Sequence, residues 1–75
     1  MRMATIEDLF RALYSLDNVL FIELKFNGDE WAAHARVGVA PPRFISRHLP
    51  DAENAGRKIM EALLLDCEAE ASGLQ

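Results

Sequence analysis

Cysteine, long hydrophobic runs and basic residues are all scarce in this chain of 75 residues. Cys67 is the single cysteine, so no internal disulfide can form, and we expect the protein in the reducing cytoplasm. The longest apolar runs, such as residues 62–65, fall far short of the roughly 20 residues that a membrane-spanning helix needs. The N-terminal residues show no apolar segment of the signal-peptide kind. These features argue against a membrane protein and against a disulfide-stapled one.

Motifs for catalysis and for cofactor or metal binding are also missing. The sequence has neither a glycine-rich phosphate loop nor a nucleophile-elbow motif. His34 and His48 have no cysteine nearby and no metal-ligand spacing. Adjacent carboxylates occur at a predicted helix start and at a predicted turn, where solvent keeps both ionised. We therefore predict no catalytic residue, no metal site and no cofactor, and a protein that is not an enzyme.

Charge is present, but its balance is acidic. Eight Lys and Arg residues stand against twelve Asp and Glu residues, which gives a formal net charge of −4. Because contacts to phosphates need Lys and Arg, this balance argues against a general nucleic-acid-binding protein. Four acidic residues fall between positions 61 and 70 without any basic residue, namely Glu61, Asp66, Glu68 and Glu70. This segment is either a solvated helix end or an acidic surface presented to a basic partner.

Two helices are predicted, one near each end of the chain. Thr5 followed three residues later by Asp8 resembles a capping box, and the apolar spacing after it predicts a helix to about Leu16. Asp51, which follows a proline, is the predicted cap of a second helix that runs to about residue 71. Gly56 lies inside this helix, which indicates a close approach to another element, for which Trp31 is a candidate.

Residues 19–39 have the alternation of a β-hairpin with two unequal faces. The predicted core face comprises Leu20, Ile22, Leu24, Phe26, Trp31, Ala33, Ala35, Val37 and Val39. The opposite face comprises Phe21, Glu23, Lys25, Glu30, Ala32, His34 and Arg36. Because this second set mixes charge with one aromatic ring, it predicts a displayed surface that is suited to binding.

The turn of this hairpin leaves two registers open. Asn27-Gly28 favours a type I′ turn with a two-residue loop, which pairs Leu24 with Trp31. A four-residue loop from Asn27 to Glu30 would pair Phe26 with Trp31 instead. Both registers keep the same residues on the same face, and we favour the shorter loop. Residues 43–49, which follow two prolines, form either a short third strand or an extended crossover.

These elements predict a single domain over residues 1–75 with an ordered core over about 5–71. The fold class is α+β in the order α-β-β-(β)-α. We expect one antiparallel sheet built on the hairpin, with two helices packed on one face. A chain this short buries only about 60% of its unfolded surface, so one core must serve the whole domain.

The order of elements over residues 5–65 resembles the double-stranded RNA-binding domain. Domains of that family place lysines at the start of their last helix, where they grip phosphates. The matching positions, residues 51–56, carry two acidic residues and no basic one, and Arg57 and Lys58 come a turn later. This resemblance implies the alternative of a nucleic-acid-binding module, although the basic residues lie one turn later than the phosphate-binding lysines of the family.

In size, acidity and lack of catalytic motifs, the chain also resembles small inhibitors of the anti-CRISPR type that phages and mobile elements encode. That resemblance implies a stoichiometric blocker whose acidic surface occupies a basic nucleic-acid-binding site on a defence complex. A third alternative is a homodimeric structural or adaptor subunit that adds the edge of its hairpin to another sheet.

The function that we predict from the sequence is non-catalytic protein binding through an acidic surface, most specifically inhibition of a nucleic-acid-handling complex. The partner is a protein with a basic surface, rather than nucleic acid or a membrane, and the chain itself is a monomer or a homodimer. The predicted partner-binding residues are Phe21, Glu23, Asp29, Glu30, Glu61, Asp66, Glu68 and Glu70. Phe21 is the expected apolar anchor, because aromatic residues tend to dominate the energetics of interfaces.

Overall fold

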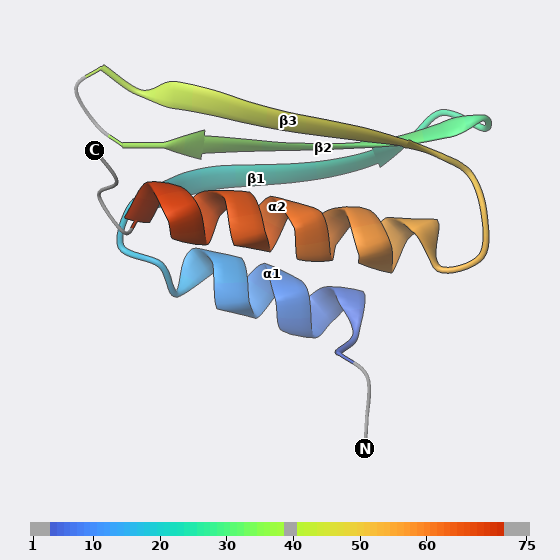
Figure 1. The fold of residues 1–75 in the computed structure, drawn as a ribbon, viewed down its shortest axis with the longest axis horizontal. Helices are drawn as coiled ribbons and strands as arrows, with labels where there is room; N and C mark the ends of the chain where they lie inside the picture. The colour runs from blue at the N-terminus through green and yellow to red at the C-terminus, as the bar shows by residue number, and fades with distance from the viewer. Residues whose placement is uncertain (1–3, 39–40, 72–75) are drawn as a thin grey trace.

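The computed structural model describes residues 4–38 and 41–71, and shows two helices and one three-stranded antiparallel sheet (Figure 1). The elements in chain order are α1 (Ile6–Tyr14), β1 (Val19–Phe26), β2 (Glu30–Val37), β3 (Arg43–Pro50) and α2 (Ala55–Ala71). The strands lie in the order β1-β2-β3, so β2 is central. The predicted α+β class is confirmed, and residues 43–49 are part of a third strand. Val39, which was assigned to the core face, lies outside the described residues.

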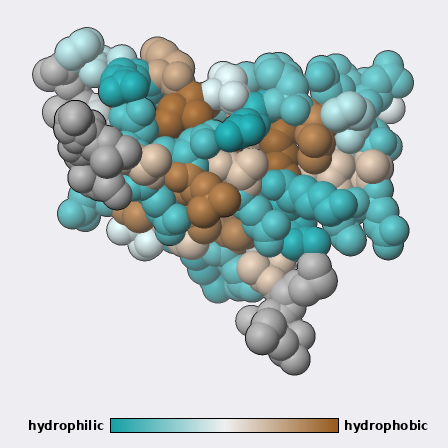
Figure 2. All heavy atoms as spheres, viewed as in Figure 1, coloured by the Kyte–Doolittle hydropathy of each residue, from teal (hydrophilic) through white to brown (hydrophobic). Residues whose placement is uncertain are grey.

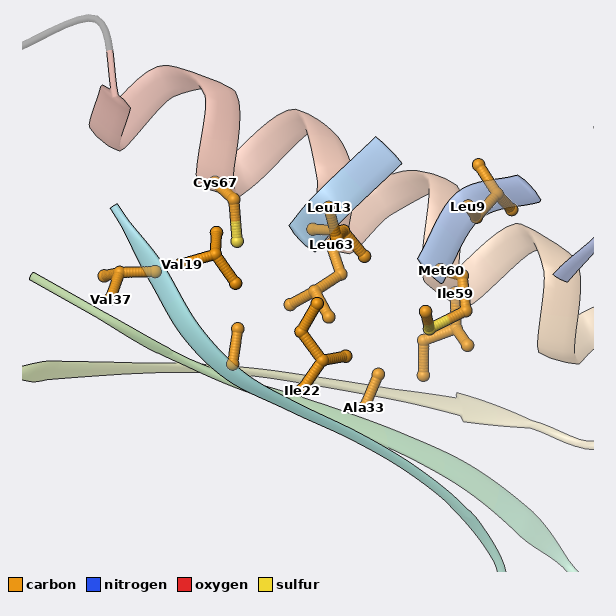
Figure 3. Close-up of a cluster of buried hydrophobic side chains, with 11 residues drawn as sticks. Leu9, Leu13, Val19, Ile22, Ala33, Val37, Ile59, Met60, Leu63 and Cys67 are labelled. Carbon is orange, nitrogen blue, oxygen red and sulfur yellow. The ribbon is translucent and has the colours of Figure 1, made fainter. Parts of the chain in front are cut away.

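Both helices cover the same face of the sheet, and the hydrophobic core fills the space between the two layers (Figure 3). Helix α2 lies over β2 and β3, and α1 lies over β1. The buried core residues are Leu9, Leu13, Val19, Ile22, Ala33, Ala35, Val37, Ala55, Ile59, Met60, Leu63 and Cys67. Ala33 and Ala35, at the centre of β2, are small, and they leave room for the larger side chains of α2 in the core.

The start of α1 has the predicted capping box. The Thr5 hydroxyl accepts the backbone N–H of Asp8, and the Asp8 carboxylate accepts the backbone N–H of Thr5, each over 3.0 Å. These two contacts satisfy amides that have no partner within the helix. The helix ends at Tyr14, two residues before the predicted end at Leu16.

Helix α2 begins at Ala55, so the prediction that Asp51 caps it is wrong. The Asp51 carboxylate instead accepts the indole N–H of Trp31. Asn54 has a positive φ of 62°, and its carbonyl accepts the backbone N–H of Lys58. The chain therefore turns sharply immediately before the helix, and a contact 20 residues away in the sequence takes the side chain that local rules assign to the cap.

The hairpin has the register of the longer loop, so the favoured two-residue register is wrong. Phe26 is opposite Trp31, and Glu23 is opposite His34. The Asn27 side chain accepts the backbone N–H groups of both Asp29 and Glu30 over 2.9 Å. Asn27 does not adopt the positive φ that a type I′ turn requires, whereas Gly28 has a φ of 102°. The asparagine acts through its side chain as a local cap of the turn.

A β-bulge at Leu20 changes which residues at the start of β1 face the core. The pairing with β2 shifts between Val19 and Phe21, so that Leu20 has no direct partner. Val19 is consequently buried, whereas Leu20, predicted in the core, is 39% exposed. Phe26 was also placed on the core face, but it is half exposed and stacks on Trp31 with ring centroids 4.7 Å apart. From Phe21 to Lys25 the predicted alternation holds.

Gly56 confirms the predicted close approach between α2 and the sheet. A Cβ at this position would lie 3.1 Å from Cζ3 and 3.2 Å from Cη2 of Trp31. It would also lie 3.3 Å from Cδ1 of Ile6. The absence of a side chain at Gly56 therefore lets the indole of β2, the start of α1 and the start of α2 meet.

Candidate functional site

The face of the sheet that points away from the helices is uncovered by any described element, and we call it the displayed face. Its residues, in cross-strand rows given by the register, are Phe21-Arg36-Phe44, Glu23-His34-Ser46, Lys25-Ala32-His48 and Glu30-Pro50. The sequence predicted the contributions of β1 and β2 to this face. The contribution of β3 was missed, because the sequence left this segment open between a strand and a crossover.

Two aromatic rings flank an arginine in the first row of the displayed face. Phe21 on β1 and Phe44 on β3 are both opposite Arg36 on β2. Phe21 is 50% exposed, and Phe44 is 73% exposed. Exposed aromatic rings of this size are available as contact points, because their burial in an interface removes a large apolar area from water.

Two histidines occupy the centre of the displayed face. His34 Nδ1 is 2.9 Å from the Ser46 hydroxyl, and the rings of His34 and His48 meet edge to face with centroids 6.0 Å apart. His48 Nδ1 lies 3.8 Å from a carboxylate oxygen of Glu30. The cross-strand contacts therefore join His34 to β3 and His48 to the start of β2. Among the described residues, no group of three or more His, Cys, Asp or Glu side chains is placed to hold a metal ion.

The hairpin turn and the loop between β3 and α2 meet at one end of the sheet (Figure 1). The backbone N–H of Asp51 donates to the carbonyl of Asp29 over 3.0 Å. Three acidic residues, Asp29, Glu30 and Asp51, thereby lie at this end, which we call the acidic end. The sequence predicted the first two as partner-binding residues and missed Asp51, because residues 29 and 51 become neighbours only through the pairing of β2 with β3.

The acidic residues of α2 are largely bound within the protein. Arg47 of β3 donates two hydrogen bonds to the Asp66 carboxylate, over 2.6 Å and 2.9 Å. This pairing lowers the pKa of Asp66, chiefly through the hydrogen bonds from the guanidinium. Arg43 of β3 reaches Glu70 over 2.8 Å. Two of the predicted partner-binding carboxylates therefore hold β3 against α2.

The two remaining acidic residues of α2 differ in their surroundings. Glu61 accepts a hydrogen bond of 2.8 Å from Arg57, one turn earlier in the same helix. Glu68 is exposed and lies in the last turns of α2. The eight predicted partner-binding residues thus divide into two groups. Phe21, Glu23, Asp29 and Glu30 lie on the displayed face or at the acidic end, and the others lie on the helical side.

Cys67 has the character of a core residue. It is fully buried, and burial raises the pKa of its thiol to about 11, with smaller contributions from the nearby carboxylates of Asp66 and Glu70. Because the thiolate is the reactive form, a raised pKa makes this cysteine unreactive at neutral pH.

The helices and the surface give two further observations. No helix in the described ranges, 4–38 and 41–71, is long and apolar enough to cross a membrane. On the face that Figure 2 shows, hydrophobic residues reach the surface in separate patches divided by hydrophilic ones. A partner that approaches this side therefore meets a mainly hydrophilic surface.

Comparison with known proteins adds no relative to this description. No protein-family model matches the chain, and neither a curated protein nor a solved structure matches it. The fold and the surface therefore carry the functional argument, and they define a small α+β domain with an uncovered sheet face.

Proposed function

We propose that this protein is a non-catalytic binding domain that occupies a basic surface of a partner protein. The observation that carries the proposal is the acidic end, where Asp29, Glu30 and Asp51 meet at the edge of an uncovered sheet face. In its most specific form, the proposal is a stoichiometric inhibitor of a nucleic-acid-handling complex of the CRISPR-like defence type. Such an inhibitor acts in the cytoplasm, where the single cysteine stays reduced.

The physical basis of this function is charge mimicry. Carboxylates at one end of the sheet take the place of phosphates against Arg and Lys on the partner, and complementary charge speeds the encounter. Asp29 and Asp51 are exposed, and the neutral indole N–H that the Asp51 carboxylate accepts leaves its negative charge uncompensated. Asp66 and Glu70, in contrast, are already neutralised by arginines of β3. We therefore assign the contact surface to the acidic end and the displayed face.

Phe21 and Glu23 extend this contact surface along β1. Phe21 is half exposed and supplies an apolar anchor, whereas Glu23 lies between it and the acidic end on the same face. An aromatic anchor mainly slows dissociation, and peripheral charges mainly speed association. The two parts of the surface should therefore be separable by kinetics.

A nucleic-acid-binding module is the alternative function, and the confirmed α-β-β-β-α order is the observation that favours it. The charge at the start of α2 does not support this alternative. Arg57 is bound to Glu61, with the arginine side chain only 15% exposed, so Lys58 is the basic residue left to solvent in this first turn. Because each phosphate contact adds to the affinity for nucleic acid, a single lysine at this position would contribute only weak binding.

The test starts with capture of the partner from the source cell by the tagged full-length chain. Association and dissociation rates are then measured at two salt concentrations. Asp29→Lys should slow association and weaken its dependence on salt, whereas Asp17→Lys, an equal charge reversal in the loop after α1, should leave both unchanged. Phe21→Ala should speed dissociation by at least about tenfold if the ring is an anchor.

Three results would count against this function. The first is the recovery of no protein partner, and the second is association of Asp29→Lys at the parent rate. The third is binding of duplex RNA or DNA at about 0.15 M salt that Lys58→Ala weakens, which would favour the nucleic-acid-binding module instead.

A further inference from the structure

The two edges of the sheet are treated differently. At the β1 edge, the Tyr14 hydroxyl accepts the backbone N–H of Ile22 over 3.0 Å, and the bulge at Leu20 interrupts the strand. Both features prevent another strand from pairing there. Strand β3 forms the other edge, runs unbroken for eight residues, and pairs only with β2 within the described part of the chain.

The hydrogen bond to Tyr14 also reveals which backbone groups of β3 point outward. Ile22 directs its N–H away from β2, so Ile22 and Ala35 form a non-hydrogen-bonded pair. In such a pair both residues point their N–H and C=O groups away from each other. Ala35 therefore points its backbone groups away from β1 and toward Ile45 of β3. The odd-numbered residues of β3 thus point their backbone N–H and C=O groups toward β2. The hydrogen bond from the backbone N–H of Asp51 to the carbonyl of Asp29 agrees with this pattern.

The even-numbered residues of β3 therefore present their backbone groups at the open edge. These are Phe44, Ser46 and His48, which are all exposed, and Pro50, which has no N–H. Pro42 precedes the strand, so a proline stands four residues before Ser46 and another stands four residues after it. The open edge is consequently symmetric about Ser46, with three donors bounded by two residues that cannot donate.

We propose that β3 pairs antiparallel with β3 of a second copy of this chain, with Ser46 opposite Ser46 of the second copy. In this register Phe44 is opposite His48 of the second copy. At each end of the paired strands, Pro42 of one copy is opposite Pro50 of the other, and neither has an N–H to donate. Every outward N–H of residues 44, 46 and 48 then finds a carbonyl. The two three-stranded sheets become one continuous sheet with all four helices on one side.

The side chains fit this arrangement as well as the backbone does. Phe44 is 73% exposed in the single chain, and it would be covered by the histidine ring of the second copy on the displayed face. On the helical side, Arg43 and Arg47 would not confront the second copy as free charges, because Glu70 and Asp66 neutralise them. Both contributions favour a second copy of this chain over an unrelated strand.

The helices are also placed to meet. Helix α2 lies over β2 and β3, and paired strands are about 4.8 Å apart, so the two copies of α2 would lie about 10 Å apart, within the usual packing distance. Ala62 and Ala69 lie four residues before and three residues after Asp66, so all three are on the same side of α2. This is the side that is directed toward β3, because Asp66 binds Arg47. Small residues there leave room for the second helix, and the exposed Leu65 adjoins them.

The decisive experiment is a cysteine cross-link in the full chain. Opposite residues in a hydrogen-bonded pair have Cα atoms about 5.5 Å apart, which is within the range that a disulfide spans. Ser46→Cys should therefore form a covalent dimer under mild oxidation. Phe44→Cys is the matched control, because its two copies would lie about 13 Å apart along the strands. Cys67 does not compete, since it is buried.

Mass measurement over a range of concentrations gives an independent test. The wild type should reach twice the chain mass of 8.4 kDa. Ser46→Pro, which removes the central outward donor without touching the bonds to β2, should raise the dimer dissociation constant at least about tenfold. Ser46→Ala keeps that N–H and should dimerise as the wild type does. If Ser46→Pro fails to fold by circular dichroism, Phe44→Lys replaces it, with the same expected loss of dimer.

The proposal is overturned by a wild type that stays monomeric up to millimolar concentration, or by a dimer that neither Ser46→Pro nor Phe44→Lys weakens. Cross-linking of Phe44→Cys as efficiently as Ser46→Cys would overturn the register. The dimer leaves the β1 side of the displayed face uncovered and does not rest on the proposed function.

Discussion

The indole Nε1–H of Trp31 donates a hydrogen bond of 3.0 Å to Oδ1 of Asp51, and this contact joins the start of β2 to the loop that leads into α2. The same indole lies against Gly56 in the first turn of α2 and against the ring of Phe26. One side chain thus links both strands of the hairpin to the second helix. The stability of this end of the molecule should depend on that link.

Asp51→Ala should lower the free energy of unfolding by about 1 kcal/mol, because it removes a hydrogen bond to a charged acceptor that is partly open to water. The measurement is urea denaturation followed by Trp31 fluorescence. Asp51→Asn keeps an acceptor oxygen and should cost less. Asp29→Ala, at the same end of the sheet, should stay within about 0.5 kcal/mol of the wild type, because its side chain is exposed. An equal loss in both alanine variants would contradict a specific role for the indole contact.

Gly56→Ala should destabilise the protein, although alanine favours a helix by about 1 kcal/mol over glycine. The new Cβ would lie 3.1 Å from the indole, which the bond to Asp51 and the stack on Phe26 hold in place. Overpacking of this kind costs about 1–3 kcal/mol, so we expect a small net loss by thermal denaturation.

A double-mutant cycle separates overpacking from other causes. Gly56→Ala should become neutral or stabilising in a Trp31→Phe background, because the smaller ring leaves room for the methyl group. Additivity of Gly56→Ala and Trp31→Phe would contradict the proposed contact.

Asp66→Asn should lower the melting temperature at pH 7 and remove part of its acid dependence. Arg47 lowers the pKa of Asp66 in the folded state, so the ion pair contributes stability above the ordinary carboxyl pKa of 3.8 and loses it as the pH falls through the folded pKa. The melting temperatures of variant and wild type should therefore differ fully above about pH 5 and converge in acid. Glu53→Gln, at an exposed loop position, is the control. A constant difference at every pH would contradict the pairing.

Cys67 should make the wild type sensitive to alkali. The pKa of its thiol is raised from 9.0 to about 11 on folding, so its contribution to stability is complete below pH 9 and is lost as the pH rises toward 11. The melting temperature of the wild type should fall more steeply over this interval than that of Cys67→Ala, which removes the thiol. At pH 8 a thiol reagent should modify Cys67 only as fast as the protein unfolds. Rapid labelling of the folded protein would show that the thiol is accessible.

Local sequence signals determined a large part of this fold. The capping box of α1 and the alternation from Phe21 to Lys25 follow from the preferences of neighbouring residues, and the glycine inside the predicted second helix indicated a close approach there. The α+β class follows from the order of these signals along the chain. The same signals placed Phe21 and Glu23 on one face of the first strand and Asp29 and Glu30 at the turn, because the alternation of a strand and the tip of a turn are local properties.

Only the tertiary structure decided the hairpin register, the bulge at Leu20 and the true start of α2. The start of α2 depends on a contact between residues far apart in the chain, the one between Trp31 and Asp51, which takes the side chain that local rules assign to the cap. The bulge depends on how β1 pairs with β2, and the turn depends on the Asn27 side chain, which accepts the N–H groups of Asp29 and Glu30. The acidic end and the ion pairs of β3 with α2 have the same origin, since β3 must pair with β2 before its side chains reach either place. The sequence therefore determined which residues are charged, and the pairing of the third strand decided which of those charges remain free to meet a partner.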